Sequence, residues 1–343
     1  MTAAEAVLVL LWIAVTAYAL LGGADFGGGF WDLIAGGPKE GARQRALIEH
    51  SIGPVWEANH VWLIFFLVLL WTSFPVAFAS IASTLLIPLT LAAFGIILRG
   101  SGFAFRKTVQ EIPLQRLFGG AFALSSVVTP FFLGAAAGAV ASGRVPPGNA
   151  RGDILRSWVN PTSLLAGVLA VGVCAYLAAV YLTGDARREG ARDVAEGFRL
   201  RAMVTGVVVG VVAIGGIGIL HADAPRLFHG LTHRGLPLIV GSAVFGVASL
   251  GLLWSRRYGL VRVTAALAVV AVVWGWGVAQ FPYILEPQLT FRQAAAPATT
   301  LHAMLVSLGV GAAILVPPLV WLYVLFQRGR PQKDPTVRAT GSG

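Results

Sequence analysis

Charged residues are scarce in this sequence, and their scarcity limits what kind of protein it can encode. Only 12% of the 343 residues are Asp, Glu, Lys or Arg, whereas 57% are hydrophobic and the mean hydropathy is +0.78. A chain of this length would ordinarily form about two soluble domains, but so few charges cannot cover a water-facing surface. The composition therefore excludes a soluble globular protein and predicts an integral membrane protein.

Cysteine and methionine are also rare. The only cysteine, Cys174, lies in an apolar stretch, which excludes a disulfide within the chain and a cysteine-based metal site. Methionine, a usual axial partner of histidine on a low-spin heme, occurs three times. No metal-ligand spacing stands out among the histidines, which are His50, His60, His221, His229, His233 and His302. We therefore expect this chain to bind no heme and no metal.

Apolar runs near the roughly 20 residues of a membrane-spanning helix recur along the chain, and none alternates as a β-barrel strand does. The first run, from Ala4 to Leu21, lacks a basic leader and a cleavage site, so it is interpreted as a span and not as a signal peptide. The sequence predicts an all-α polytopic protein with nine transmembrane helices, at about 4–22, 53–72, 76–98, 119–141, 162–183, 202–220, 237–254, 262–281 and 301–326.

The predicted spans belong to one transmembrane domain, residues 1–326, followed by a polar cytoplasmic tail at 327–343. Residues 1–141 and 162–281 are interpreted as a weak pseudo-repeat, with the last helix at 301–326 outside it. This division favours two four-helix bundles and one peripheral helix.

Basic residues are distributed unevenly between the two sides of the predicted membrane. If the amino terminus lies outside, the inner loops hold 19 Lys and Arg residues, Arg99 among them, and the outer loops hold 6. Such an excess of positive charge inside is typical of membrane proteins and predicts a cytoplasmic carboxyl terminus. It also accounts for the net charge of +10 without nucleic-acid binding.

Two carboxylates lie where charge is costly, because an ionisable group in a bilayer raises the energy of insertion by a few kcal/mol or more. Asp25 follows the first apolar run within a glycine-rich segment, 21–30, which permits close backbone approach or a broken helix. The alternative is an ordinary helix-end aspartate at the inner interface.

Glu57 opens the second span and stands three residues before His60, so both side chains share one helical face. A carboxylate and an imidazole within reach of each other can relay a proton. The alternative interpretation of Glu57 is a carboxylate that caps the helix amino terminus.

These polar segments resemble subunit II of cytochrome bd-type quinol oxidases. The resemblance rests on Ala24–Gly29, Ile52–Trp62 and Leu98–Arg106, in this order and spacing, with later similarities at Asn160–Gly167 and Phe281–Ile284. Each motif alone is weak, but together they cover nearly all of the chain.

The resemblance implies a non-heme subunit of a terminal oxidase that reduces oxygen to water with electrons from a quinol. Its partner would be a subunit I that carries b-type and d-type hemes and usually the quinol site, in the plasma membrane of a bacterium or archaeon. Membrane lipid, quinone and small accessory subunits are further expected partners. The resemblance also implies a proton route through Asp25 and Glu57, to which His60 is added here, and structural roles for Gly27, Trp56, Asn59 and Arg99.

The chain departs from the family pattern at three positions. Glu57–Ala58 stands where the family has Asp-Gly, His60 replaces Glu or Gln, and Ala104 lies where an acidic residue is common. These departures indicate a divergent branch. The competing interpretations are a proton-coupled secondary transporter with Asp25 and Glu57 as coupling carboxylates, and a purely structural membrane partner.

Overall fold

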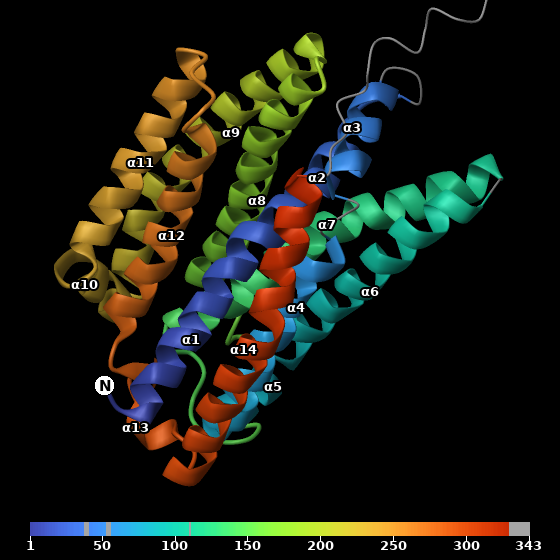
Figure 1. The fold of residues 1–343 in the computed structure, drawn as a ribbon. Coiled ribbons are helices and arrows are strands. Elements are labelled where there is room, and N and C mark those ends of the chain that lie inside the picture. Colours follow the sequence, from blue (N-terminus) through green and yellow to red (C-terminus); the bar gives the residue numbers. More distant parts are fainter. Residues whose placement is uncertain (38–40, 53–55, 110, 329–343) are drawn as a thin grey trace, which may run out of the picture.

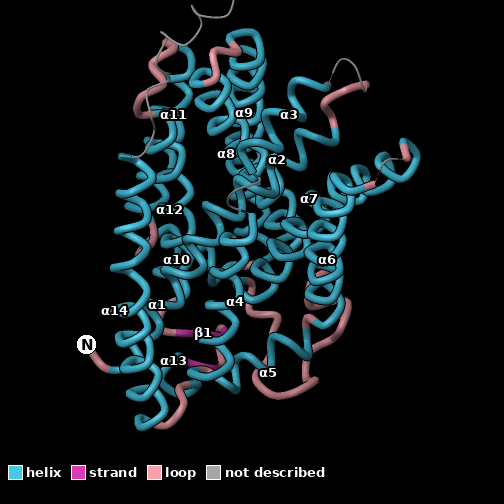
Figure 2. The backbone as a smooth tube through the Cα atoms, turned by 45° about the vertical axis from the view of Figure 1, so that its right-hand side comes forward, coloured by secondary structure: helices cyan, strands magenta, loops and turns pink. Residues whose placement is uncertain are grey.

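The computed structural model describes residues 1–37, 41–52, 56–109 and 111–328, with backbone alone at 56–58, 106–108, 112, 319 and 322–328. These residues form helices almost throughout (Figures 1 and 2). The elements are α1 (Ala3–Ala17), the π-helical turn η1 (Tyr18–Gly22), α2 (Gly23–Leu33), α3 (Ala42–Ile52), α4 (Trp56–Ser73), α5 (Pro75–Thr84), α6 (Leu86–Thr108), α7 (Ile112–Ala141), α8 (Pro161–Arg188), α9 (Arg192–Asp223), α10 (Pro225–His233), α11 (Leu236–Trp254), α12 (Val261–Gln280), β1 (Tyr283–Leu285), β2 (Leu289–Thr290), α13 (Phe291–Ala294) and α14 (Ala298–Arg328).

The all-α membrane architecture predicted from the sequence is confirmed. Within the described residues, eight helices are long and apolar enough to cross a membrane, and α4 with α5 makes a ninth span if that bent pair counts as one. The predicted tail at 327–343 lies outside the described residues except for the last two residues of α14. The division into a pseudo-repeat and two bundles stays a prediction.

The third predicted span, 76–98, is wrong in its first half. The chain bends by 118° between α4 and α5, and the membrane-spanning helix is α6, which begins only at Leu86. Pro75 begins α5, and the hydroxyls of Ser80 and Ser83 accept hydrogen bonds of 2.8 Å from the backbone N–H groups of Gly148 and Ala150. These contacts fasten α5 to the loop between α7 and α8, which the apolar composition of the segment does not reveal.

The first span also differs from its prediction, because it does not end or break at the glycine-rich segment. It runs as α1, η1 and α2 without interruption from Ala3 to Leu33. The local irregularity is the π-helical turn at Tyr18–Gly22, which inserts an extra residue into the helix. Asp25 therefore lies inside a continuous helix and is 3% exposed, so the helix-end interpretation of this residue is excluded.

The connections between helices gather at two opposite ends of the molecule. The β1–β2 hairpin, α5, α13 and the amino terminus lie at one end, whereas α3 and the α11–α12 connection lie at the other (Figure 1). Gly230 of α10 packs on the backbone of Ala279, near the end of α12 that precedes the hairpin. The alternation of loops along the predicted path is thus present in the fold.

Three consecutive glycines on α2 let three other helices approach its backbone. A Cβ atom at Gly27 would lie 1.8 Å from the carbonyl oxygen of Cys174 on α8. At Gly28 it would lie 2.3 Å from Ile52 Cδ1 on α3, and at Gly29 it would lie 2.1 Å from Ser126 Oγ on α7. A side chain at Gly27 would overlap backbone, and one at Gly28 or Gly29 would displace a neighbouring side chain, so α3, α7 and α8 all pack closely against α2.

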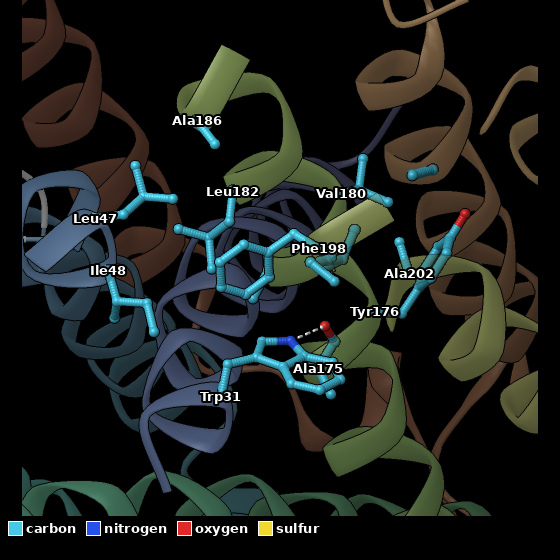
Figure 3. Packing of buried hydrophobic residues seen from close by; sticks show 14 of the residues in the cluster. Trp31, Leu47, Ile48, Ala175, Tyr176, Val180, Leu182, Ala186, Phe198 and Ala202 are labelled. Carbon is cyan, nitrogen blue, oxygen red and sulfur yellow. Dashed lines mark hydrogen bonds between the residues drawn. The ribbon is translucent and has the colours of Figure 1, made fainter. Parts of the chain in front are cut away.

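A large cluster of buried hydrophobic residues continues this packing towards the end that carries α3 (Figure 3). The indole Nε1 of Trp31 donates a hydrogen bond of 2.8 Å to the carbonyl oxygen of Ala175, and the Trp31 ring meets Phe198 edge-on. Leu47 and Ile48 bring α3 into the same cluster. The carboxyl-terminal part of α2, which contains Trp31, therefore packs against α3, α8 and α9.

We expect Gly27→Ala to lower the free energy of unfolding by at least about 2 kcal/mol, because the new methyl group overlaps backbone that cannot move aside. The matched control is Gly210→Ala on α9, where no described atom lies within 4 Å of the added Cβ. Alanine should there stabilise the helix by about 0.5–1 kcal/mol. Thermal unfolding in detergent measures both changes, and equal shifts would contradict the packing account.

Candidate functional site

A buried ion pair lies at the centre of the chain's first half. Arg99 Nη2 of α6 lies 2.5 Å from Asp25 Oδ1 of α2, and each side chain is only 1% exposed. The same Nη2 donates a hydrogen bond of 3.1 Å to the backbone carbonyl of Asp25, and Nη1 donates to Ser126 Oγ of α7. Burial removes both charges from water at a cost of several kcal/mol per ion, so neither is tolerated without the other. The pair therefore links α2, α6 and α7.

Two aromatic rings complete the surroundings of the arginine. The guanidinium carbon of Arg99 lies 5.0 Å from the ring centroid of Phe26 and 4.6 Å from that of Phe122. Both distances are within the range of attraction between a cation and an aromatic ring. Arg99 is thus held by a carboxylate, a hydroxyl and two rings, although the sequence analysis counted it among the residues of an inner loop.

The correction for Arg99 leaves the predicted charge asymmetry intact. Removing this buried residue from the inner side leaves 18 basic residues there against 6 on the outer side. The buried position also explains how an arginine can stand within a membrane-spanning helix, because it is paired instead of facing lipid.

The helix α4 brings polar groups to the other side of Asp25. Asn59, which is 5% exposed, lies next to the carboxylate, and His60 acts on it electrostatically. The His60 ring centroid lies 6.1 Å from that of Phe26 and 6.3 Å from that of Tyr18. Asp25 Oδ2 forms no hydrogen bond of ordinary geometry with the described residues. The structure thus places Asp25, Asn59 and His60 in one polar cluster.

Two of the residues singled out in the sequence have no described side chain. Trp56 and Glu57 lie in the first turn of α4, where the structure describes the backbone alone. The prediction that Glu57 and His60 share a face therefore rests on their spacing within the helix. Gly27 of α2 lies at the contact with α8, where the absence of a side chain lets the two helices pack closely.

Several residues around this polar cluster were not identified as candidates in the sequence analysis. Ser126 and Phe122 have ordinary counterparts throughout an apolar sequence, and nothing in their spacing relates them to Asp25, whereas Phe26 follows Asp25 directly but received no predicted role. Tyr18 is likewise inconspicuous, although the structure places it in the π-helical turn. Only the unusual cost of an arginine at position 99 inside an apolar run could have signalled a buried partner.

The cluster has the chemistry of proton transfer. A carboxylate and an imidazole both take up and release protons near neutral pH when the environment permits it, and neither requires a metal for this purpose. The described residues contain no group of three His, Cys, Asp or Glu side chains placed to hold a metal ion. The fixed cation of Arg99 balances the buried carboxylate when it is ionised.

Comparison with known families places these residues in context. Residues 3–326 match the family described as cytochrome bd terminal oxidase subunit II. The match thus includes every helix that carries a residue of the cluster.

Individual relatives agree with this match over their full length. The chain is 22% identical to the putative cytochrome bd menaquinol oxidase subunit II of Bacillus subtilis, covering 94% of each protein. It is 23% identical to the cytochrome bd-I ubiquinol oxidase subunit 2 of Escherichia coli, covering 97% of this chain and 96% of the relative. A chain in the structure of bd oxidase from Geobacillus thermodenitrificans superposes with a TM-score of 0.74 at 25% identity, covering 96% of this chain and all of the other.

A double-mutant cycle on the buried pair should show strong coupling. We expect Arg99→Gln alone to destabilise the protein by about 3–5 kcal/mol, because Asp25 remains buried without its cation. Asp25→Asn alone should act in the same direction, and the double variant should be more stable than the sum of the two losses predicts. Thermal unfolding in detergent supplies the four values.

The control cycle uses Arg43 and Asp193, whose side chains are 66% and 65% exposed. An exposed pair contributes only about 0–1 kcal/mol, so Arg43→Gln and Asp193→Asn should change stability little. Additive effects at Asp25 and Arg99 would show that the two charges do not depend on each other.

Proposed function

The chain belongs to the family of cytochrome bd terminal oxidase subunit II, and from this premise we propose that its Asp25 cluster is part of a route for protons towards the partner subunit. The observation that carries the proposal is the buried Asp25–Arg99 pair with Asn59 and His60 beside it. A membrane protein keeps such groups in its interior at considerable cost, and they mark pathways of ions and protons more often than packing.

As subunit II of a bd-type quinol oxidase, the chain is part of an oxidoreductase that reduces oxygen with electrons from a quinol. Two quinols give up four electrons and four protons, and one oxygen molecule takes up four electrons and four protons to become two waters. Oxygen reduction therefore needs a supply of protons as well as of electrons. Within the low-dielectric interior, that supply requires groups that bind and release protons in succession.

The proposed division of labour places the redox chemistry in the partner. Subunit II of a bd oxidase has a subunit I partner, and we assign the b-type and d-type hemes and the quinol site to it. The hemes would supply electron transfer and oxygen reduction there.

The roles of the individual residues follow from their places in the fold. Asp25 Oδ2 is the atom that takes up a proton, since Oδ1 is engaged by Arg99. Arg99 positions this carboxylate and offsets its charge. His60 exchanges the proton through a ring nitrogen, and Glu57, one helical turn earlier on α4, carries it on towards subunit I.

The orientation of the chain determines from which side the protons come. We assign the protein to the plasma membrane of a bacterium or archaeon, with its amino terminus outside and its carboxyl terminus in the cytoplasm. The excess of basic residues on the α3 side supports this orientation. Protons for oxygen reduction then enter from the cytoplasm at the α3 end.

The transporter alternative is not supported, because the family and the relatives that match over the whole chain are oxidase subunits. The relatives are named for both menaquinol and ubiquinol, so either quinol fits the proposed reaction. Both reactions make the same demand for protons on this chain.

Replacing Glu57 by Gln should preserve assembly and heme content but slow oxygen reduction. The amide keeps the size and hydrogen bonding of the side chain while it loses the exchangeable proton. Glu57→Asp should be milder because it retains a carboxylate. Oxygen consumption by the purified complex, normalised to heme, measures both variants.

If Glu57 instead caps α4, Gln should reduce the yield of assembled complex and leave turnover per heme normal. Unchanged turnover of Glu57→Gln would remove this residue from the route.

The orientation is tested separately by thiol labelling. A cysteine at Thr2 should react with a membrane-impermeant reagent in intact cells, whereas a cysteine at Gly343 should react only after the membrane is opened. Background labelling is low because the native Cys174 is buried. Labelling of Gly343→Cys in intact cells would reverse the orientation.

A further inference from the structure

A narrow hollow lies between α2, α3, α6 and α7, on the α3 side of the Asp25 cluster. Its walls include Asp32, Arg45, Glu49, Phe103 and Phe122. Its empty volume of about 280 Å³ includes space that is open to the outside. The enclosed part is small, with room for about one water molecule. The partly exposed Arg45 lies at its open side, and the buried Phe122 lies at its inner wall.

Asp32 is the buried carboxylate of this hollow. It lies on α2 seven residues after Asp25, two helical turns further along and on the same face. The residue is only 6% exposed. Like Asp25, it is a carboxylate withdrawn from water in the middle of packed helices.

Arg45 of α3 holds Asp32 in place. Its Nε lies 3.1 Å from Asp32 Oδ1. Its other two nitrogens donate hydrogen bonds to the carbonyl oxygens of Gly36 and Gly37, at 2.5 Å and 3.1 Å. The Arg45 side chain is 24% exposed, so this ion pair stands at the boundary between water and the interior. Glu49 follows Arg45 by one turn on the same face of α3.

The inner wall of the hollow is shared with the Asp25 cluster. The Phe103 and Phe122 rings contact each other at a centroid distance of 5.7 Å. The Phe122 ring also lies 4.6 Å from the guanidinium carbon of Arg99. A single layer of aromatic side chains therefore separates the hollow from the buried ion pair.

We propose that this hollow is the cytoplasmic entrance of the proton route, with Asp32 as its first buried proton carrier and Arg45 as the residue that positions Asp32. The proposal rests on the function proposed above for Asp25. A hydronium ion at the mouth gives a proton to the carboxylate of Glu49 or Asp32 and leaves a water molecule behind. The proton then passes from Asp32 to Asp25, which restores the Asp32 carboxylate, and leaves Asp25 along the proposed route, which restores the Asp25 carboxylate; no redox partner is needed.

The step from Asp32 to Asp25 needs a bridge. Seven residues of α-helix span about 10 Å, which is too long for direct transfer between two carboxyl groups. Water entering between Phe103 and Phe122 bridges this distance. In this proposal the aromatic layer makes the access of water intermittent.

The test compares Asp32→Asn, Asp32→Glu and Asp25→Asn in the complete oxidase complex, with turnover expressed per heme. Asp32→Asn should slow oxygen reduction about tenfold, which corresponds to about 1.4 kcal/mol in activation free energy. Its solvent isotope effect in D₂O should increase, because proton uptake becomes the slow step. Asp32→Glu should restore most of the turnover.

Asp193→Asn is the matched control. Asp193 also forms an ion pair with an arginine of α3, Arg43, but both side chains are largely exposed. Its turnover and isotope effect should equal those of the unmodified complex.

The outcomes separate the entrance from the route itself. If Asp25→Asn slows turnover and Asp32→Asn does not, the proposed entrance at Asp32 is wrong and the proposed route through Asp25 stands. If Asp32→Asn only lowers the yield of complex, with normal turnover per heme and a normal isotope effect, Asp32 is a structural partner of Arg45 and the entrance is again overturned. If neither variant changes turnover per heme, both the entrance and the route fail.

Discussion

The structure depends on the burial of one ion pair, Asp25 with Arg99. Two opposite charges removed from water gain little net stability, because desolvation offsets most of their attraction. The pair instead constrains how the helices pack, because either charge alone would be intolerable at 1% exposure. The glycines at 27–29 allow α2 to approach its neighbours closely enough for the pair to be enclosed, and Ser126 of α7 satisfies a further nitrogen of Arg99. A packing requirement and a charge requirement are thus met by the same helix contacts.

The sequence is informative where a physical rule acts along the chain. Apolar length predicts the spans 237–254 and 262–281 to within one residue of α11 and α12, because lipid solvates every helix in the same way, but it begins the span of α9 ten residues too late. The same rule fails at Leu85, since a bend within apolar sequence leaves hydropathy unchanged. Asp25 could be recognised as costly from its position alone, but its pairing with Arg99, 74 residues away, is a property of helix packing. The pairing of Asp32 with Arg45 likewise follows only from the packing of α3 against α2.

The two ends of the protein differ in how they use charge. At the α3 end, buried and exposed pairs occur side by side, as Asp32 with Arg45 and Asp193 with Arg43 show. At the opposite end, Arg144 forms a bidentate pair with Asp223, which in turn accepts hydrogen bonds from Thr162 at the start of α8. This group holds together the start of α8, the end of α9 and the loop that follows α7. The ion pairs at this end therefore join helix ends, whereas a pair at the α3 end includes a buried carboxylate, Asp32.

The π-helical turn at Tyr18–Gly22 gives the first span a rotational phase that residue identities alone do not determine. Successive residues of an α-helix are rotated by about 100° around its axis, and a π-helical turn contains one residue more than an α-helical turn. Deletion of one residue here, with closure of the turn into regular helix, would keep Asp25 on the buried side, whereas closure with every residue retained would rotate Asp25 by about 100° relative to the buried face of α1. Its carboxylate would then point away from Arg99, although both residues were still present. The π-helical turn between α1 and α2 is therefore as much a part of the site as the carboxylate itself.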